Sequence, residues 1–168
     1  MGKDFHIEND MNTILEKEFA ICDIKEFREK LQNAQHILYL GDNAGESVFD
    51  KLLIETLNKP VTYAVRGRAI INDVTEKDAR DSGLDEVAEI ISSGSPAPAT
   101  ILELCNEKFL ERFQQADMII SKGQGNYEGL SGTDRPVFFL LKAKCPVIAR
   151  DIGVEEDDIV LKYARKNV

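Results

Sequence analysis

Amphipathic segments and continuously apolar segments alternate along most of the chain. Apolar residues repeat at helical spacing over 24–33, and Asp23 is a candidate N-cap. A short apolar run over 36–41 ends at a glycine, which is typical of a buried parallel strand. A second helix is predicted over 45–57 and a second strand over 61–65. The apolar residues near one face of this second helix are Val48, Leu52 and Leu53.

The same alternation continues through the second half of the chain. A short helix is predicted over 75–82, ended by Gly83. A third strand is predicted over 86–91. A helix that is interrupted near its start follows over 102–115, and a fourth strand follows over 117–121.

Two further apolar segments, 137–141 and 146–149, are predicted as a fifth and a sixth strand. Strands that alternate with helices pair in parallel and are joined by right-handed crossovers. The sequence therefore predicts a three-layer, doubly wound α/β fold with a Rossmann-like, mainly parallel sheet. We expect this single domain to span 23–168, and residues 1–22 to form a polar lead-in with a helical pattern over 11–19.

The composition is that of a globular protein, and the charge restricts its partners. The 168 residues suffice for one domain with a sizeable core, and 43% of them are hydrophobic. The formal net charge is −9, so most of the surface repels nucleic acid and anionic membranes. No apolar run is long enough to span a membrane, and no signal-peptide pattern opens the chain. We therefore expect a cytoplasmic protein with neither kind of partner; no pattern indicates an oligomeric state.

The cysteines and histidines form no metal-binding or disulfide pattern. Cys22, Cys105 and Cys145 are odd in number and far apart, without a C-x-x-C pair. We interpret each cysteine as a small core residue. His6 and His36 are isolated, and a structural role is the simpler interpretation of His36.

Polar residues gather at the points where the predicted strands end. The four segments that follow the first four strands are 41–46, 66–73, 92–96 and 122–128. Open parallel sheets bind ligands outside the carboxyl ends of their strands, so these segments meet at one edge if the sheet is parallel. A phosphorylated ligand at that edge needs a locally positive environment, because the chain as a whole is acidic.

Asp42, Asn43 and Asp73 are the candidate metal ligands at this edge. Hard divalent cations such as Mg²⁺ and Mn²⁺ bind carboxylate and amide oxygens, which these residues supply from two strand ends. Each residue has a structural alternative, because Asp and Asn are also good helix caps. Glu46 either favours a helix N-terminus through the helix dipole or supports the ligands without binding the metal.

A second group of residues at the same edge has the chemistry to bind phosphate. A Ser-Ser-Gly-Ser segment can form a concave nest of backbone N–H groups, a lysine can neutralise a phosphate, and an arginine can bind an anion with two N–H groups. An asparagine can orient water or substrate hydroxyls. The alternatives are an ordinary Gly/Ser turn and solvent-exposed cations. The candidates are Ser93, Gly94, Lys122, Gly123, Arg66 and Asn126.

The order of these motifs resembles that of the damage-control phosphatase family. The matching segments are Tyr39–Glu46, Arg66–Thr75, Ser93–Ser95 and Lys122–Glu128, and the resemblance runs from about Asp23 to near the C-terminus. It implies a metal-dependent phosphatase of small phosphorylated metabolites, such as sugar phosphates or damaged cofactor intermediates. The implied cofactor is Mg²⁺, Mn²⁺, Co²⁺ or Ni²⁺.

The resemblance also assigns roles to residues of this chain. It makes Asp42, Asn43 and Asp73 the metal ligands, and it places Lys122 on the phosphate with Ser93–Gly94 in the phosphate cradle. Members of the family carry an all-helical region ahead of the Asp-Asn strand. Here about 35 residues precede that strand, so we expect a compact variant or a fragment of a longer protein.

The implied mechanism leaves the attacking group open. The metal and Lys122 would offset the charge of the transition state, and either a water molecule or Asp42 would attack phosphorus. The Asp-x-Asp phosphatases are not indicated, because Ala44 stands where their second acid is needed. Two other functions fit the sequence. One is a nucleotide- or S-adenosylmethionine-binding Rossmann-like protein, such as a methyltransferase, since Gly41–Gly45 follows a strand. The other is a non-catalytic metabolite-binding module.

Overall fold

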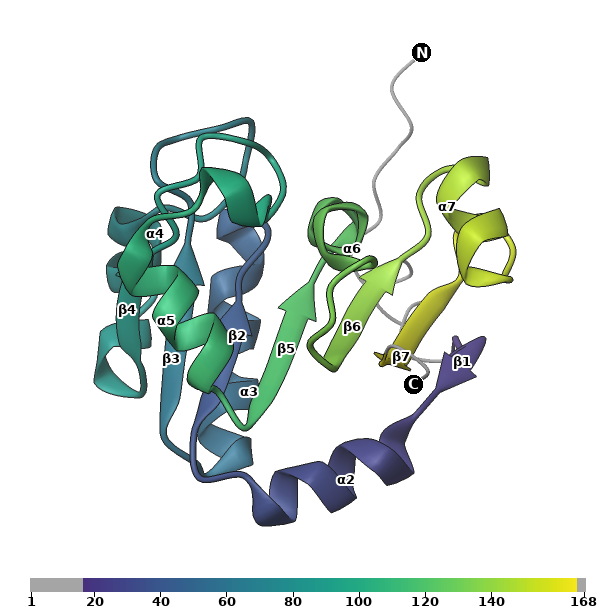
Figure 1. Ribbon diagram of the computed structural model, residues 1–168, viewed down its shortest axis with the longest axis horizontal. Coiled ribbons are helices and arrows are strands. Elements are labelled where there is room, and N and C mark those ends of the chain that lie inside the picture. Colours follow the sequence, from purple (N-terminus) through teal and green to yellow (C-terminus); the bar gives the residue numbers. More distant parts are fainter. Residues whose placement is uncertain (1–16, 166–168) are drawn as a thin grey trace.

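The computed structural model describes residues 17–165, in which one sheet of seven strands has helices on both faces (Figure 1). The strands are β1 (Ile21–Cys22), β2 (Ile37–Leu40), β3 (Val61–Val65), β4 (Glu89–Ser92), β5 (Met118–Lys122), β6 (Val137–Lys142) and β7 (Ile159–Ala164). The α-helices are α2 (Ile24–Asn33), α3 (Ser47–Leu57), α4 (Glu76–Asp81), α5 (Glu107–Gln115), α6 (Gln124–Leu130) and α7 (Pro146–Ile152). Single 3₁₀ turns lie at Ala44–Glu46, Leu84–Glu86 and Leu102–Leu104.

The strand order is β1-β7-β6-β5-β2-β3-β4, and only β6 and β7 pair antiparallel. From β2 the chain adds β3 and β4 on one side, and it then returns to add β5 and β6 on the other. The direction of winding therefore reverses between β2 and β5. In open α/β sheets, ligands bind outside the carboxyl ends of the strands at such a reversal.

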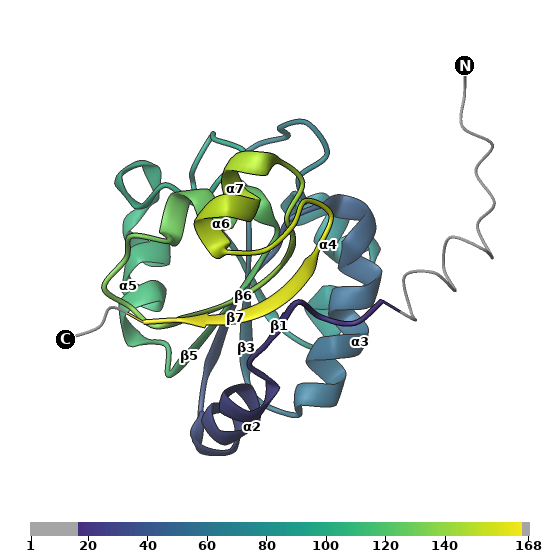
Figure 2. The same ribbon diagram turned by 90° about the vertical axis from the view of Figure 1, so that its right-hand side faces the viewer.

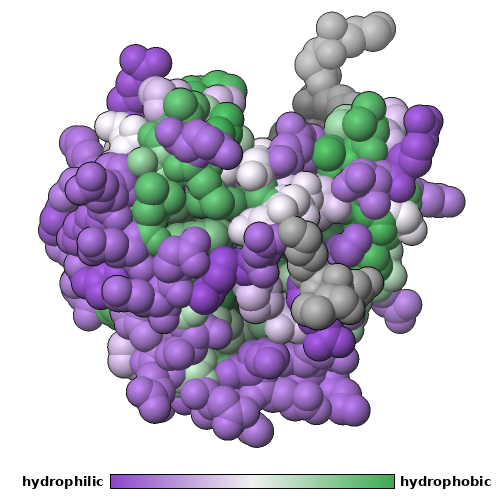
Figure 3. Space-filling view, viewed as in Figure 1, coloured by the Kyte–Doolittle hydropathy of each residue, from purple (hydrophilic) through white to green (hydrophobic). Residues whose placement is uncertain are grey.

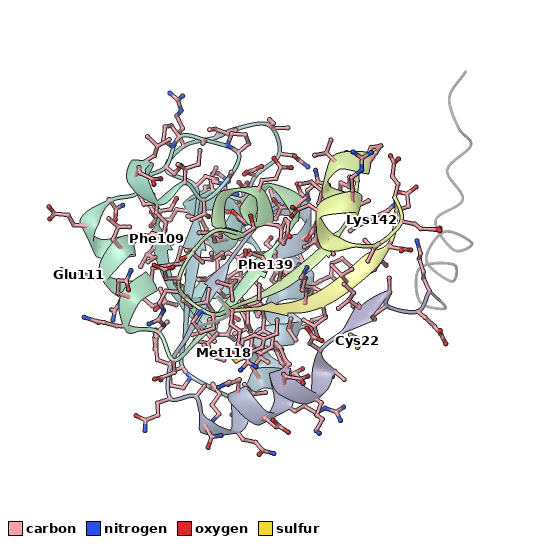
Figure 4. The ribbon with its side chains drawn as sticks, turned by 45° about the vertical axis from the view of Figure 1, so that its right-hand side comes forward. Cys22, Phe109, Glu111, Met118, Phe139 and Lys142 are labelled. Carbon is pink, nitrogen blue, oxygen red and sulfur yellow. The ribbon has the colours of Figure 1, made fainter. Side chains whose placement is uncertain are left out.

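Two apolar cores hold the layers together, one on each face of the sheet. Successive residues of β2 point to opposite faces, so Leu38 belongs to the core under α5, α6 and α7, and Tyr39 to the core under α2, α3 and α4. Figure 2 shows the two helical layers on either side of the sheet. Phe109 lies on the sheet-facing side of α5 and is fully buried, whereas Glu111 points outward (Figure 4).

Local signals explain where several elements begin and end. Thr75 caps α4 in a capping box with Asp78, and Gly83 follows the helix with a φ of +75°. The Asn106 side chain caps α5 by accepting a hydrogen bond from the N–H of Phe109 at 2.9 Å. These caps fix the loops that run along the edge of the sheet.

The predicted fold class is confirmed, and most predicted elements are present. The predicted sixth strand over 146–149 is wrong: this segment is the first half of α7, with Pro146 in the first turn, where its missing N–H costs nothing. The predicted third strand over 86–91 is displaced, because β4 begins only at Glu89. The sequence interpretation also missed the helix α6, the strands β7 and β1, and the 3₁₀ turn at Leu84–Glu86.

Several expectations about burial need correction. Leu53 packs against the core, but Val48 and Leu52 are more than half exposed, and α3 buries Ile54 and Leu57 instead. Cys22 is exposed and therefore is not a core residue, while Cys105 and Cys145 are partly buried.

The structural role expected for His36 fits its contact, because its Nε2 lies 2.9 Å from Oγ1 of Thr62. His6 and most of the helical pattern over 11–19 lie outside the described residues.

Hydrophilic residues cover the left-hand side and the bottom of the face shown in Figure 3, whereas the area over α6 is of intermediate hydropathy. An apolar patch lies over the segment between β4 and α5, where Leu104 is 47% exposed. Within residues 17–165, no helix has both the length and the apolar character that a membrane crossing requires.

Candidate active site

The loops that follow β2 and β3 are held against each other by backbone contacts. Asn43 and Asp73 form an isolated antiparallel bridge, and the N–H of Val74 donates to the carbonyl of Asp42 at 2.7 Å. The structure therefore brings the three predicted metal ligands together at one edge of the sheet. That edge adjoins the point between β2 and β5 where the winding reverses.

Asp42 lies in an environment that disfavours a bare negative charge. Its carboxylate is largely buried, and within the described residues it accepts a hydrogen bond only from Asn43, at 3.2 Å. Burial, together with the charges of Glu46 and Asp73, raises the pKa of Asp42 to about 6. A Cβ at Gly123 would come within 3 Å of all three carboxyl atoms, so only glycine leaves room for this carboxylate. A bound cation would stabilise its charged form.

The side chain of Asn43 is oriented by its neighbours. Its Nδ2 donates to Oε1 of Glu46 at 2.7 Å and to Oδ2 of Asp42 at 3.2 Å. Ionised carboxylates only accept hydrogen bonds, so the NH₂ group must face them and Oδ1 must face away. Within residues 17–165 no donor contacts this Oδ1. The amide oxygen is thus available to a ligand.

Arg66 holds Asp73 in place. Its Nε donates to Oδ2 of Asp73 at 2.6 Å, and its terminal nitrogens donate to Oγ1 of Thr100 at 3.1 Å and to Oδ1 of Asn126 at 2.8 Å. Asn126 in turn donates to the carbonyl of Gly41 at 3.1 Å. Arg66 and Asn126, both predicted as phosphate contacts, are buried and bonded to other parts of the protein.

Lys122 lies at the end of β5 and is held by two carboxylates. Its Nζ is 2.9 Å from Oε2 of Glu46 and 2.8 Å from Oδ1 of Asp50. Burial acts to lower the pKa of Lys122, but these two carboxylates outweigh burial and raise the pKa above its usual value. The sequence interpretation did not include Asp50, because a single aspartate inside a predicted helix carries no signal for a site.

The charges at this edge favour a divalent cation. Four carboxylates, those of Asp42, Glu46, Asp50 and Asp73, face only two directly bonded cations, Arg66 and Lys122. The carboxylates thus outnumber the cations that are directly bonded to them by two. No group of three His, Cys, Asp or Glu side chains able to hold a metal occurs in the described part of the chain. The candidate set is instead two carboxylates and one amide oxygen, which suits a hard cation that keeps several waters.

The predicted phosphate cradle lies close to the β3–α4 loop. A Cβ at Gly67 would clash with the backbone of Gly94, so the two loops touch. The N–H of Ser93 donates to the carbonyl of Val65 at 2.8 Å, and the N–H of Gly94 donates to Oγ of Ser92 at 3.1 Å. Both amides are already bonded within the protein. The N–H of Gly123 is likewise bonded, to the carbonyl of Leu140 at 3.0 Å.

A pocket of about 380 Å³ adjoins the candidate metal ligands, and its lining includes Asp42, Glu46, Lys122, Lys142 and Lys144. The positive charge of Lys144 acts to lower the pKa values of Asp42 and Glu46, so its ammonium group lies near them.

Sequence reasoning missed Lys144, although a signal was present. Lys142 and Lys144 stand at and just beyond the end of β6, a strand that the apolar pattern predicts, and only the ends of the first four strands were considered.

Comparison with known proteins identifies relatives along nearly the whole chain. The sequence model of the damage-control phosphatase ARMT1-like domain matches residues 2–160. A damage-control phosphatase of Pyrococcus horikoshii is 41% identical over 159 residues, which cover 92% of this chain and 55% of that protein. A damage-control phosphatase of Archaeoglobus fulgidus is 41% identical over 140 residues, covering 80% of this chain and 49% of that protein.

An uncharacterized protein of Methanocaldococcus jannaschii is 45% identical over 139 residues, covering 79% of this chain and 46% of that protein. The crystal structure of a DUF89 family protein from Pyrococcus horikoshii superposes with a TM-score of 0.90 at 38% identity, over 96% of this chain and 59% of that one. The chain thus spans about half the length of the curated relatives it matches.

Proposed function

Because the chain belongs to the ARMT1-like damage-control phosphatase family, we propose that it hydrolyses phosphate esters of small metabolites with the help of a divalent cation. The observation that carries the proposal is the charge imbalance at the reversal point of the sheet. Asp42 and Asn43 present oxygens there that no described donor satisfies fully, beside carboxylates that outnumber the bonded cations. A divalent cation would offset that excess.

The residues that would hold the cation are Asp42, Asn43 and Asp73. A cation bound there supplies a Lewis acid that withdraws charge from the phosphoryl oxygens. Such oxygen ligands suit Mg²⁺, Mn²⁺, Co²⁺ or Ni²⁺. Arg66 keeps one oxygen of Asp73 occupied, and Glu46 keeps the amide oxygen of Asn43 turned outward. These contacts orient the ligand oxygens before substrate binds.

The phosphoryl group would meet cations that line the adjoining pocket. Lys122 uses two of its three N–H groups on carboxylates, which leaves one for a phosphoryl oxygen. Lys144 lines the same pocket and has no carboxylate partner within hydrogen-bonding distance in the described residues. The pocket volume falls within the range usual for small-molecule sites, so a metabolite such as a sugar phosphate is a suitable substrate.

Other predicted contacts have supporting roles in this proposal. Asn126 and Arg66 hold the loops at this edge of the sheet through contacts within the protein and do not touch the substrate. Ser93 and Gly94 lie beside the β3–α4 loop at the same edge, and their contact with phosphate stays a prediction. The attacking group is either a water molecule or the carboxylate of Asp42.

The test is the hydrolysis of p-nitrophenyl phosphate by wild type, Asp42→Ala and Asp151→Ala, with and without Mn²⁺. Asp151 is the matched control because its carboxylate accepts a hydrogen bond from Tyr127, whose ring packs in the core under α5, α6 and α7, on the face of the sheet opposite α3. We expect Mn²⁺ to stimulate wild type and Asp151→Ala, and Asp42→Ala to lose at least a hundredfold in activity. Asp42→Ala should also lose the thermal stabilisation that Mn²⁺ gives to wild type.

Two results would contradict the proposal. Equal metal-stimulated activity in wild type and Asp42→Ala would remove the site assignment. Binding of a phosphate ester by the wild-type chain without turnover, at saturating metal, would instead indicate a metabolite-binding module.

A further inference from the structure

A buried carboxylate lies behind Lys122 at the rim of the site. Asp50, on α3, is 1% exposed. Its Oδ1 accepts hydrogen bonds from the hydroxyl of Tyr39 at 2.6 Å and from Nζ of Lys122 at 2.8 Å, and its Oδ2 accepts one from the hydroxyl of Tyr63 at 2.8 Å. An ionised carboxylate at such a depth is stable only when donors surround it. Three donors meet that requirement here.

The two tyrosines belong to the framework of the sheet. Tyr39 and Tyr63 are register partners on β2 and β3, and their rings stack with centroids 5.4 Å apart. Burial, together with the charge of Asp50, raises the pKa of each tyrosine, so both remain neutral O–H donors. A Cβ at position 41 would collide with the hydroxyl of Tyr63, so only a glycine at this position leaves room for that hydroxyl.

A lysine that binds phosphate works best when its ammonium group is held in place. A free lysine side chain has many rotamers, and ordering them upon binding costs free energy. Asp50 is fixed by two tyrosines from the central strands, and it fixes Lys122 in turn. Glu46 alone is a poorer anchor, since its own side chain is 39% exposed.

We propose that Asp50, held by Tyr39 and Tyr63, is a positioning residue that fixes the ammonium group of Lys122 for contact with the substrate phosphate. The proposal rests on the proposed phosphatase function. It assigns a role in the site to three buried side chains that do not touch the substrate. It also predicts that these side chains affect phosphate binding and turnover more than metal binding.

The main test removes both hydroxyls in the double variant Tyr39→Phe/Tyr63→Phe, which keeps the ring packing and the net charge. Tyr127→Phe is the matched control, because the hydroxyl of this buried tyrosine donates at 2.7 Å to Asp151 on α7 and not to Asp50. At saturating Mn²⁺, we expect the double variant to lose at least tenfold in kcat/KM for p-nitrophenyl phosphate. Tyr127→Phe should stay within twofold of wild type. The Mn²⁺ concentration for half-maximal thermal stabilisation should change less than twofold in both variants.

A second measurement separates positioning from a purely structural or purely electrostatic role. It follows the protection of the Mn²⁺-loaded protein against thermal unfolding by inorganic phosphate. Asp50→Asn removes one negative charge. The loss of this charge would by itself strengthen phosphate binding and lower the phosphate concentration needed for half-maximal protection. If Asp50 positions Lys122, that concentration should instead rise at least fivefold.

The outcomes are distinguishable. The inference fails, while the phosphatase function stands, if the double variant keeps kcat/KM within twofold of wild type, or if Asp50→Asn binds phosphate more tightly. If wild type binds phosphate but does not hydrolyse the ester, the proposed function fails and the protection experiment alone decides on Asp50. If wild type neither hydrolyses the ester nor binds phosphate, both proposals are overturned.

Discussion

Replacing Gly123 by alanine should displace the carboxylate of Asp42 as well as strain the backbone. Gly123 has φ +81° and ψ 158°, a region populated almost only by glycine, where another residue costs about 1–3 kcal/mol. The added Cβ would also come within 3 Å of every carboxyl atom of Asp42. The carboxylate must then retreat by on the order of 1 Å to reach an ordinary non-bonded separation.

The loss of reaction rate that such a shift of a catalytic group causes can be estimated. A misplacement of about 1 Å can cost roughly a hundredfold in rate, which corresponds to about 2.7 kcal/mol of transition-state stabilisation. We therefore expect Gly123→Ala to lose about a hundredfold in metal-stimulated kcat/KM. Its free energy of unfolding should fall by about 1–3 kcal/mol.

Gly153→Ala is the matched control, because Gly153 also has a positive φ, +87°, but a Cβ there would meet nothing within 4 Å. This variant should lose about 1–2 kcal/mol of stability and keep its activity. The assays are urea unfolding and p-nitrophenyl phosphate hydrolysis over a range of Mn²⁺ concentrations. A folded Gly123→Ala protein with kcat/KM within threefold of the control would refute the argument that Gly123 makes room for Asp42.

Three further substitutions test the framework of the site and the loops near it. Arg66→Ala leaves Asp73 buried without its partner, so urea unfolding should show a loss of about 3–5 kcal/mol; a loss below 1 kcal/mol would contradict the buried ion pair. Thr75→Ala removes the capping box of α4 and should cost about 1 kcal/mol at neutral pH, whereas an unchanged urea midpoint would count against that cap. Ile71 is 87% exposed and has a φ of +49°, a conformation that asparagine adopts more readily than isoleucine. Ile71→Asn should therefore raise the free energy of unfolding by about 1 kcal/mol. A loss of stability would show that Ile71 makes a contact worth more than its backbone strain.

The fold was predictable because its central strands depend on simple local patterns. β2, β3 and β5 are short apolar runs that alternate with helices, and that alternation is enough to predict parallel pairing. The segment after β6 was harder to predict. Pro146 to Ala149 is as apolar as a strand, and a segment of four residues cannot separate a buried strand from the first turn of a helix. Pro146, which favours the start of a helix, was the available signal.

The candidate site was predictable to the extent that it follows strand ends. Asp42, Asn43 and Asp73 could be assigned to one edge because parallel strands bring their carboxyl ends together. The contacts behind that edge depend on tertiary structure. Asp50 becomes part of the site through its contacts with Tyr39, Tyr63 and Lys122, which no local pattern encodes.

The contact between Arg66 and Asn126 also bears on how the protein becomes competent to bind metal. The two side chains are 60 positions apart in the chain, and they join the loop after β3 to helix α6, which follows β5 on the opposite side of the central strand β2. A partly folded intermediate that contains β2 and β3 but not β5 and α6 therefore lacks the contact of Asn126 with Arg66, the residue that holds Asp73. Metal affinity should appear only in the last cooperative step of folding, so a cation would select fully folded molecules over late intermediates.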